Sequence, residues 1–418
     1  MKSEQNPLKV LLLTTSFPLS RKSRSGVFIQ KMIRCLPDHV QVTVLTPDGT
    51  EGGLPISANY TVFPFRYAPK SWQQLAHGAG GIMAALARNK LFFLLLPFFL
   101  CSHLLTCCWL TRKVDVLHAN WSINGVIAGI AGLLFGKPVV TTLRGSDVNL
   151  MEKSGVMHRL VHFCLRFSVA VVTVSPSLEQ KLTEYFPQYS AKIGVICNGI
   201  DQDFFTAAEE LQKAAEGNNG GNGGHSASGQ GNKPVRFVYV GNLVPGKGVD
   251  VILKAASSLP SQISSESWQL DIIGDGPERK ALEAFCQEQD LVTQVSFHGA
   301  APPEDIPGLM ARSDVFVFAS FAEGRPNVVL EAMAVGLPVI AGAIPAVSEL
   351  IENGQQGLLF PPGDVSALAE HMALLIKEPL TRQRLGEKAR EYLHLLGLSW
   401  SESARDYARL YTEVATKN

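Results

Sequence analysis

Short apolar runs alternate along the chain with longer amphipathic or polar segments. The runs that we predict as strands are bounded by turn-forming or polar residues, and they lie at 10–13, 40–45, 114–117, 139–143, 235–240, 270–276, 295–299, 315–318 and 358–362. Amphipathic segments of helical period separate several of them, such as 27–36 and 249–257. This alternation predicts an α/β fold built from strand, crossover helix, strand units with parallel sheets.

The clearest unit spans residues 315 to 341. A strand at 315–318 leads through a polar loop into a helix at 328–335, and the next apolar run starts at residue 339. Glu323 lies in the loop, and Glu331 lies about one turn inside the helix. In a parallel sheet this loop forms part of a concave site at the carboxyl end of the strand.

The start of this helix is a candidate anion site. We expect Asn327 to cap the helix, which leaves the amide of Val328 free to face a phosphate. Helical side chains lean toward the N-terminus, so Glu331 would reach the same pocket as Glu323. Carboxylates accept hydrogen bonds from sugar hydroxyls. A structural interpretation, in which Glu331 stabilises the helix dipole by about 0.3–1 kcal/mol and Glu323 is solvated, stays open on these residues alone.

The segment from Glu323 to Glu331, EGRPNVVLE, resembles the E-x7-E signature of the retaining glycosyltransferases of family 4, also called group 1. The resemblance implies an α/β GT-B fold, with two Rossmann-like domains that face each other across a cleft. It also implies an enzyme of hexosyltransferase type. Such an enzyme transfers a sugar from a nucleotide-diphosphate donor to an acceptor with retention of anomeric configuration, and it needs no metal and no cofactor.

Composition narrows the alternatives. The 37 basic and 37 acidic residues balance, so the chain has no global charge that would favour nucleic acid. The seven cysteines are scattered without a C-x-x-C pair, which indicates neither a disulfide framework nor a zinc site. His158 and His162 have the spacing of metal ligands but no third ligand nearby. These features fit a cytoplasmic protein without a metal site.

The first half resembles the family with two departures. Gly26 stands at a strand-to-helix turn, where the family's glycine lies against the donor diphosphate. Asp115 to Asn120 is similar to the family's D-V-x-H-x-H, with His118 as the first histidine and Asn120 in place of the second. The run TLRGSD is similar to T-x-H-G-x-D, with Arg144 in place of the histidine. The resemblance places His118 and Arg144 at the catalytic site, and Arg144 would hold a diphosphate or another anionic group because arginine cannot act as a base.

The second half begins with a glycine-rich loop that has two interpretations. Residues 241–247 match the P-loop pattern G-x-x-x-x-G-K, but Gly248 stands where Mg²⁺ binding requires Ser or Thr. The family's G-R-L-x-x-x-K-G also matches, with Lys247 as the diphosphate cation and Asn242 in place of the arginine. Arg144 or Arg325 would then supply the missing charge.

The resemblance extends to the following strands and completes the predicted site. Gly276 belongs to a segment similar to I-x-G-x-G-P, and His298 lies in a region that packs against the nucleobase in the family. Together with Glu323 for the transferred sugar and Glu331 for the ribose, the predicted donor-binding residues are Gly26, Asn242, Lys247, Gly276, His298, Arg325, Asn327, Val328 and Glu331.

Residues 91–110 form an outlier, LFFLLLPFFLCSHLLTCCWL, which is long enough to span a bilayer as one helix. A crossing here would separate strands of one sheet, so we expect the segment to lie on a membrane surface or to be an ordinary buried helix. Arg88, Lys90, Arg112 and Lys113 flank it, which suits anionic lipid. We therefore expect a peripheral protein on the inner face of the cytoplasmic membrane, with a lipid-linked or saccharide acceptor.

Gly and Asn dominate residues 217–231, which cannot support a core. We expect a first domain over 1–205, a disordered linker over 206–234, a second domain over 235–397, and a closing helix over 398–418 that returns to the first domain. Three alternatives to the transferase remain: a sugar-nucleotide epimerase of the same fold, a P-loop-like nucleotide-binding protein, and a non-catalytic scaffold at the membrane.

Overall fold

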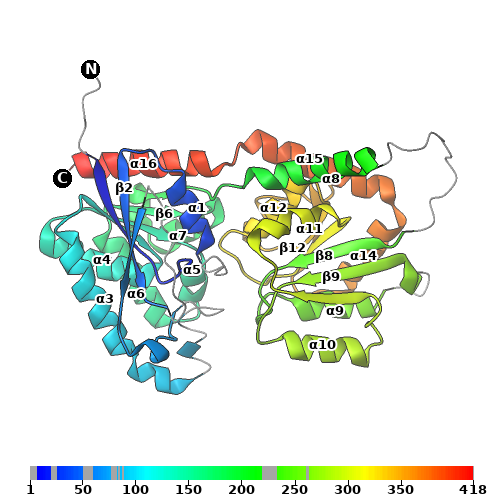
Figure 1. Ribbon diagram of the computed structural model, residues 1–418, viewed down its shortest axis with the longest axis horizontal. Helices are drawn as coiled ribbons and strands as arrows, with labels where there is room; N and C mark the ends of the chain where they lie inside the picture. The colour runs from blue at the N-terminus through cyan, green and yellow to red at the C-terminus, as the bar shows by residue number, and fades with distance from the viewer. Residues whose placement is uncertain are drawn as a thin grey trace. The chain divides into compact units, whose positions relative to one another are not determined.

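A computed structural model describes residues 7–19, 26–49, 60–76, 82, 85–86, 89–218, 233–259 and 263–417. The chain divides into two compact units, which are described separately (Figure 1). Unit 1 comprises Met1–Gly199 and Ser399–Asn418, and unit 2 comprises Ile200–Leu398. Each unit is built around one parallel sheet.

The unit 1 sheet has the strand order β3-β2-β1-β4-β5-β6-β7 within the described residues, and all its pairings are parallel. Its strands are β1 (Leu8–Leu13), β2 (Val40–Pro47), β3 (Tyr60–Phe65), β4 (Val116–Asn120), β5 (Val139–Leu143), β6 (Ala170–Thr173) and β7 (Ile193–Val195). The strand order reverses between β1 and β4, and ligands of open α/β sheets bind at the carboxyl ends of strands beside such a switch point.

Helices cover both faces of this sheet. One face packs on α1 (Val27–Arg34) and α16 (Trp400–Thr416), and the other on α3 (Leu96–Thr111) and α4 (Ser122–Phe135). The strands β5, β6 and β7 also pack on α5 (Ser146–Met151), α6 (Gly155–Phe167) and α7 (Pro176–Tyr185). The last helix of the chain is therefore part of the unit 1 core.

The apolar segment at 91–110 is not one helix. A 3₁₀ turn, η2 (Lys90–Leu94), precedes α3, and Pro97 lies in the first turn of α3, where its missing amide breaks no intrahelical bond. No helix in the described part of the chain is long and apolar enough to cross a membrane.

The unit 2 sheet has the strand order β10-β9-β8-β11-β12-β13, again with parallel pairings. Its strands are β8 (Val235–Val240), β9 (Trp268–Ile273), β10 (Val295–Gly299), β11 (Val315–Phe318), β12 (Val339–Gly342) and β13 (Gly357–Phe360). The switch point lies between β8 and β11. Alternate residues of these strands enter two separate cores, one on each face of the sheet.

One core of unit 2 contains α9 (Val249–Ser257), α10 (Arg279–Glu288) and α14 (Val365–Lys377). The other contains α8 (Gln202–Asn218), α11 (Ile306–Ala311), α12 (Asn327–Val335) and part of α15 (Pro379–Leu396), while α13 (Pro345–Ser348) follows β12 (Figure 1). The covered parallel sheet explains why its strands are continuous apolar runs.

The predicted linker was wrong over its first part. Residues 206–218 belong to α8, because Phe204, Phe205 and Ala208 bury this helix against α11 and α12. The sequence placed residues 200–205 in the first domain. For the same reason they instead pack in unit 2. The remainder of the predicted linker, residues 219–232, lies outside the described residues.

Candidate functional site

Lys247 and Glu323 meet at the switch point of the unit 2 sheet. Lys247 lies in the loop after β8, and Glu323 lies in the loop after β11. The Lys247 ammonium donates a hydrogen bond of 2.5 Å to Oε1 of Glu323, and the two side chains keep 31% and 17% of their surface exposed. The two loops thus place a cation and a carboxylate in contact, both within reach of solvent.

The start of α12 lies a few residues beyond Glu323. The helix begins at Asn327 itself, so the expectation that Asn327 caps it was wrong; Pro326 is the capping residue, and it has no side-chain acceptor. The amide of Val328 has no hydrogen-bond acceptor among the described residues, as expected for a first helical turn. Glu331 lies one turn further along and is half-buried.

Gly276 holds the neighbouring β9–α10 loop close to the loop that carries Lys247. A Cβ atom at Gly276 would stand 2.2 Å from the carbonyl oxygen of Leu243. The backbone of Leu243 also bonds to both sides of this turn, since its amide donates to Asp275 and its carbonyl accepts from Glu278. The close approach of these two loops therefore requires glycine at position 276.

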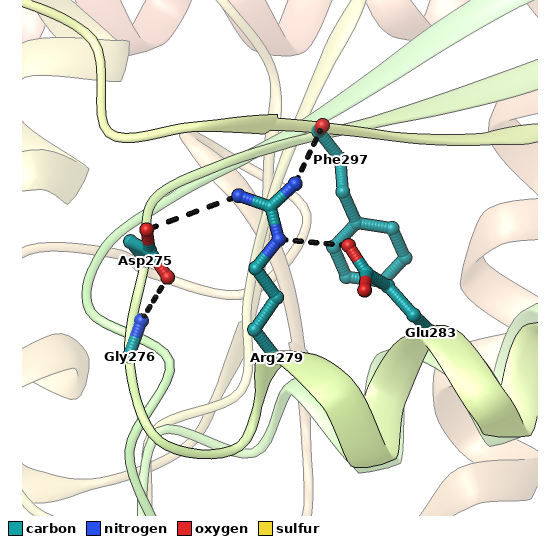
Figure 2. A network of polar contacts seen from close by, with 5 residues as sticks. All are labelled: Asp275, Gly276, Arg279, Glu283 and Phe297. Atoms are coloured by element: carbon teal, nitrogen blue, oxygen red, sulfur yellow. Dashed lines mark hydrogen bonds and ion pairs between the residues drawn. The ribbon is translucent and has the colours of Figure 1, made fainter.

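Arg279, the first residue of α10, holds the same turn in place through its side chain (Figure 2). Its Nε donates to Glu283 at 2.7 Å, one Nη donates to the carbonyl of Phe297 at 3.3 Å, and the other lies 3.9 Å from Asp275. Sequence reasoning did not select this arginine, although the G-D-G-P-E-R order places a cation just after the glycine turn. Its charge is matched by two carboxylates.

The other predicted residues of unit 2 take varied positions. Asn242 is exposed, and its carbonyl accepts a hydrogen bond from Tyr239. His298 is exposed and lies 2.5 Å from a carboxylate oxygen of Asp271. The side chain of Arg325 is only 3% exposed and lies 3.9 Å from Glu349.

In unit 1, Arg144 reaches across the carboxyl ends of the central strands. Its Nε and Nη2 donate to Oδ1 of Asn120 at 3.0 and 2.8 Å, and its Nη1 donates to Oδ1 of Asn198 at 2.9 Å. The guanidinium also lies over the ring of Phe28, 4.7 Å from its centroid. Phe28 follows β1 and Asn120 ends β4, so these contacts meet at the switch point. Asn120 and Arg144, the two residues of unit 1 that depart from the family pattern, therefore contact each other.

Gly26 precedes Phe28 and adopts a left-handed backbone, with φ of 73°. A Cβ atom here would stand 2.0 Å from the carbonyl oxygen of Ser16. The turn itself therefore requires glycine, whether or not a phosphate approaches it.

His118, which the sequence predicts at the catalytic site, takes part in a buried hydrogen-bond network. The ring is fully buried, and its nitrogens bond to Tyr411 at 2.7 Å and to Thr142 at 2.8 Å. Thr142 also bonds to Tyr407 at 3.0 Å. Burial, with a smaller contribution from the nearby charge of Arg144, lowers the pKa of His118 to about 3. The neutral ring joins α16 to the sheet.

No three His, Cys, Asp or Glu side chains within the described ranges gather in a way that could hold a metal ion. His158 and His162 instead pack against Phe186, with ring centroids 4.9 and 5.8 Å away.

Comparison with known proteins gives two matching family models. The model described as Glycosyltransferase Family 4 matches residues 25–204, and the model described as Glycosyl transferases group 1 matches residues 225–392. N-acetyl-alpha-D-glucosaminyl L-malate synthase of Bacillus anthracis is 25% identical over 286 residues, which are 68% of this chain and 71% of that protein. Glycogen synthase of Mycobacterium tuberculosis is 28% identical over 72% of this chain and 69% of that protein.

Solved structures resemble the whole chain, and among them are the following two. Sucrose-phosphate synthase from Thermosynechococcus elongatus matches with a TM-score of 0.76 and 19% identity, over 98% of this chain and all of that one. Anabaena Alr3699/HepE, solved in complex with UDP and glucose, matches with a TM-score of 0.71 and 20% identity, over 97% and 99%. The two parallel α/β units thus have the GT-B fold, and the chain is a GT-B glycosyltransferase. It belongs to glycosyltransferase family 4, the group 1 glycosyltransferases.

Proposed function

We propose that this enzyme transfers a sugar from a nucleoside-diphosphate donor to an acceptor with retention of anomeric configuration, and that the donor binds at the unit 2 switch point. The observation that carries the proposal is the contact between Lys247 and Glu323 at the carboxyl ends of β8 and β11. A cation suits the diphosphate, and a carboxylate suits the hydroxyl groups of the sugar.

The chemistry follows from charge. In the transfer, the bond between the sugar C1 and the diphosphate breaks while the acceptor oxygen bonds to C1 on the same face. The acceptor's proton passes to the leaving phosphate oxygen, and negative charge accumulates on the diphosphate. Lys247 and the free amide of Val328 stabilise this charge, and Glu331 holds the ribose. The proposal includes no metal and no cofactor.

Binding of nucleotides tests the donor site. We would measure thermal shifts with UDP, GDP, ADP, CMP and ATP, each with and without Mg²⁺, on the wild type, Glu331→Ala and the control Glu288→Ala, an exposed residue of α10. UDP is the first candidate, because it is the nucleotide in the related Anabaena structure. Stabilisation by one nucleoside diphosphate without Mg²⁺, lost only in Glu331→Ala, is expected. A response to ATP with Mg²⁺ alone would favour a P-loop-like protein, and interconversion of sugar epimers without an acceptor would favour the epimerase.

For the acceptor we propose a lipid-linked or saccharide molecule at the inner face of the cytoplasmic membrane. The large side chains of η2 and α3 that face outward are 48–71% exposed: Leu91, Phe93, Leu94, Phe98, Leu105 and Trp109. On α3 they form one stripe, because 98, 105 and 109 share a helical face. Exposed apolar patches of this kind mark interaction surfaces.

Basic residues around this stripe favour anionic lipid as its partner. Residues 52–114 contain no Asp or Glu, but they contain six basic residues. At the end of α3, Arg112 and Lys113 line one hollow together with Lys9, Lys137 and one acidic residue, Asp115, and the Lys113 ammonium lies over the ring of the exposed Trp109. Basic residues next to an apolar stripe fit a helix that lies in the headgroup region.

Vesicle sedimentation tests this contact. We expect the wild type to bind vesicles that contain phosphatidylglycerol better than pure phosphatidylcholine vesicles, and the double variant Leu105→Glu, Trp109→Glu to remain in the supernatant. The control Leu380→Glu, Leu395→Glu changes two leucines of unit 2 that are also exposed. Equal sedimentation of both double variants would contradict the membrane contact and leave the donor site unaffected.

A further inference from the structure

We propose that Arg144 and Asn120 form a binding site in unit 1 for an anionic group, a carboxylate or a phosphate, of one of the enzyme's substrates. The site lies at the switch point between β1 and β4, where the two departures of unit 1 from the family pattern meet. The proposal deepens the proposed glycosyl transfer, and rests on it for the source of the anion.

The bonds of Arg144 leave donors available. A guanidinium has five N–H groups, and three of them donate to Asn120 and Asn198. One N–H on each Nη has no acceptor among the described residues. Because both acceptors are amides and Phe28 fixes the plane from one face, the guanidinium is held in one orientation without a bonded carboxylate.

Asn120 adds a third donor. Since Arg144 only donates, Oδ1 of Asn120 must face it, and this fixes the orientation of the amide. The Nδ2 group is then buried with no hydrogen-bond partner in the described part of the chain, although Asn120 has no exposed surface. A buried amide donor without a partner is unfavourable unless a ligand or water completes it.

Arg144 makes no ion pair within the described residues, although the Asp147 carboxylate lies near enough to act on its charge. The nearby carboxylate of Asp147 accepts hydrogen bonds from the amides of Ser122 and Val148, and no acidic group among the described residues lies in ion-pair contact with Arg144. Burial raises the pKa of Asp147 above its usual value, while hydrogen bonds from the amides of Ser122 and Val148 act in the opposite direction. A partly buried cation without a paired anion is unfavourable, so an anionic ligand would stabilise this arrangement.

The backbone next to Asn120 is strained. Trp121 has φ of 67° and ψ of 155°, a region that almost only glycine adopts. Its ring packs edge-on against Phe28, 6.3 Å between centroids. Strain in a residue that bears a large side chain is typical of functional sites, because the surrounding structure must hold it in place.

Anion binding tests the site directly. We would follow the thermal stabilisation by inorganic phosphate and by malonate in a Lys247→Met background, which removes the cation of the donor site. Arg144→Gln is expected to weaken the apparent affinity for both anions about tenfold or more. The control Arg166→Gln, an exposed arginine of α6, is expected to leave it unchanged. Equal affinities in Arg144→Gln and Arg166→Gln would overturn the proposal.

A second variant and a hydrolysis assay complete the test. Should Arg144→Gln not fold, the double variant Asn120→His, Arg144→His restores the family's residues at both positions and is expected to show the same loss. Hydrolysis of UDP-glucuronate and UDP-glucose then locates the anion: a preference for glucuronate that depends on Arg144 places it on the transferred sugar, and no preference places it on the acceptor. Arg144-dependent anion binding without any response to nucleoside diphosphates would support this site while contradicting the proposed function.

Discussion

Tyr411 and His118 share a hydrogen bond of 2.7 Å, although 293 positions separate them in the chain. The bond connects α16 to β4 inside the unit 1 core, and Thr142 completes it by bonding to the other ring nitrogen of His118. The polar groups of this buried network thus satisfy one another, and the loss of one member leaves another unpaired.

Tyr411→Phe should therefore destabilise unit 1. Removal of the hydroxyl leaves Nδ1 of His118 buried and unpaired, which costs about 1–3 kcal/mol of unfolding free energy. Urea unfolding monitored by far-UV circular dichroism measures this. The control is Tyr185→Phe, whose exposed hydroxyl bonds to Glu152; equal stability of the two variants would contradict the role of the network.

His103 should make stability depend on pH. Its ring is buried on α3 against Phe65, and neither nitrogen has a hydrogen-bond partner among the described residues. Burial lowers its pKa from 6.5 to about 3. The unfolded chain binds a proton at this histidine below pH 6.5 while the folded chain does not, so stability falls as pH decreases, by about 1.4 kcal/mol per pH unit.

The variant His103→Leu isolates this effect. It removes both the titrating group and two unpaired polar atoms, so we expect equal or higher stability at pH 7 and a weaker loss of stability between pH 6.5 and 5. His118 acts in the same direction and Asp147 in the opposite one, but the difference between wild type and variant cancels both. Parallel stability curves for the two proteins would show that His103 is protonated in the folded state.

Lys247→Met should impair turnover of the donor. Loss of the cation at the diphosphate is expected to lower kcat/KM about 10²-fold or more, measured with the donor identified by the nucleotide panel. Lys254→Met is the matched control, because Lys254 is an exposed lysine of α9 that pairs with Asp250 at 2.8 Å. Wild-type kcat/KM in Lys247→Met would remove Lys247 from the active site.

Gly26→Ala should destabilise the turn after β1. The left-handed backbone costs an L residue about 1–2 kcal/mol, and the added Cβ also meets the carbonyl of Ser16 at 2.0 Å. Gly155→Ala, at the open start of α6, should instead stabilise by about 0.4–1 kcal/mol. Thermal melting compares the two, and similar melting temperatures would contradict the assigned strain.

Much of the sheet could be predicted from the sequence. The strands β5, β8, β10 and β11 have the bounds that their apolar runs indicated, since a strand covered on both faces is apolar throughout. The ends of helices were harder to predict from the sequence, because tertiary packing determines where a helix begins and ends. Composition placed most of α8, from residue 206 onward, in a linker, yet Phe204 and Phe205 anchor this helix on α12.

The candidate site could also be predicted only in part from the sequence. Its two halves in unit 2 followed from motifs at the ends of β8 and β11, and the structure brings Lys247 and Glu323 together. In unit 1, Asn120 and Arg144 were each recognised as departures, but their contact depends on how β4 and β5 align. Burial of His118 depends on tyrosines near the end of the chain, and no local pattern around His118 indicates them.

The place of α16 in unit 1 also bears on how the protein is made. The ribosome synthesises all of unit 2 before it reaches Ser399, so the strands of unit 1 emerge long before the helix that covers one of their faces. Until then Val10, Val42 and Val140 contribute to an apolar surface that lacks Tyr407 and Tyr411. Unit 2, whose chain is continuous, can complete its folding first, and unit 1 closes only after α16 has been synthesised.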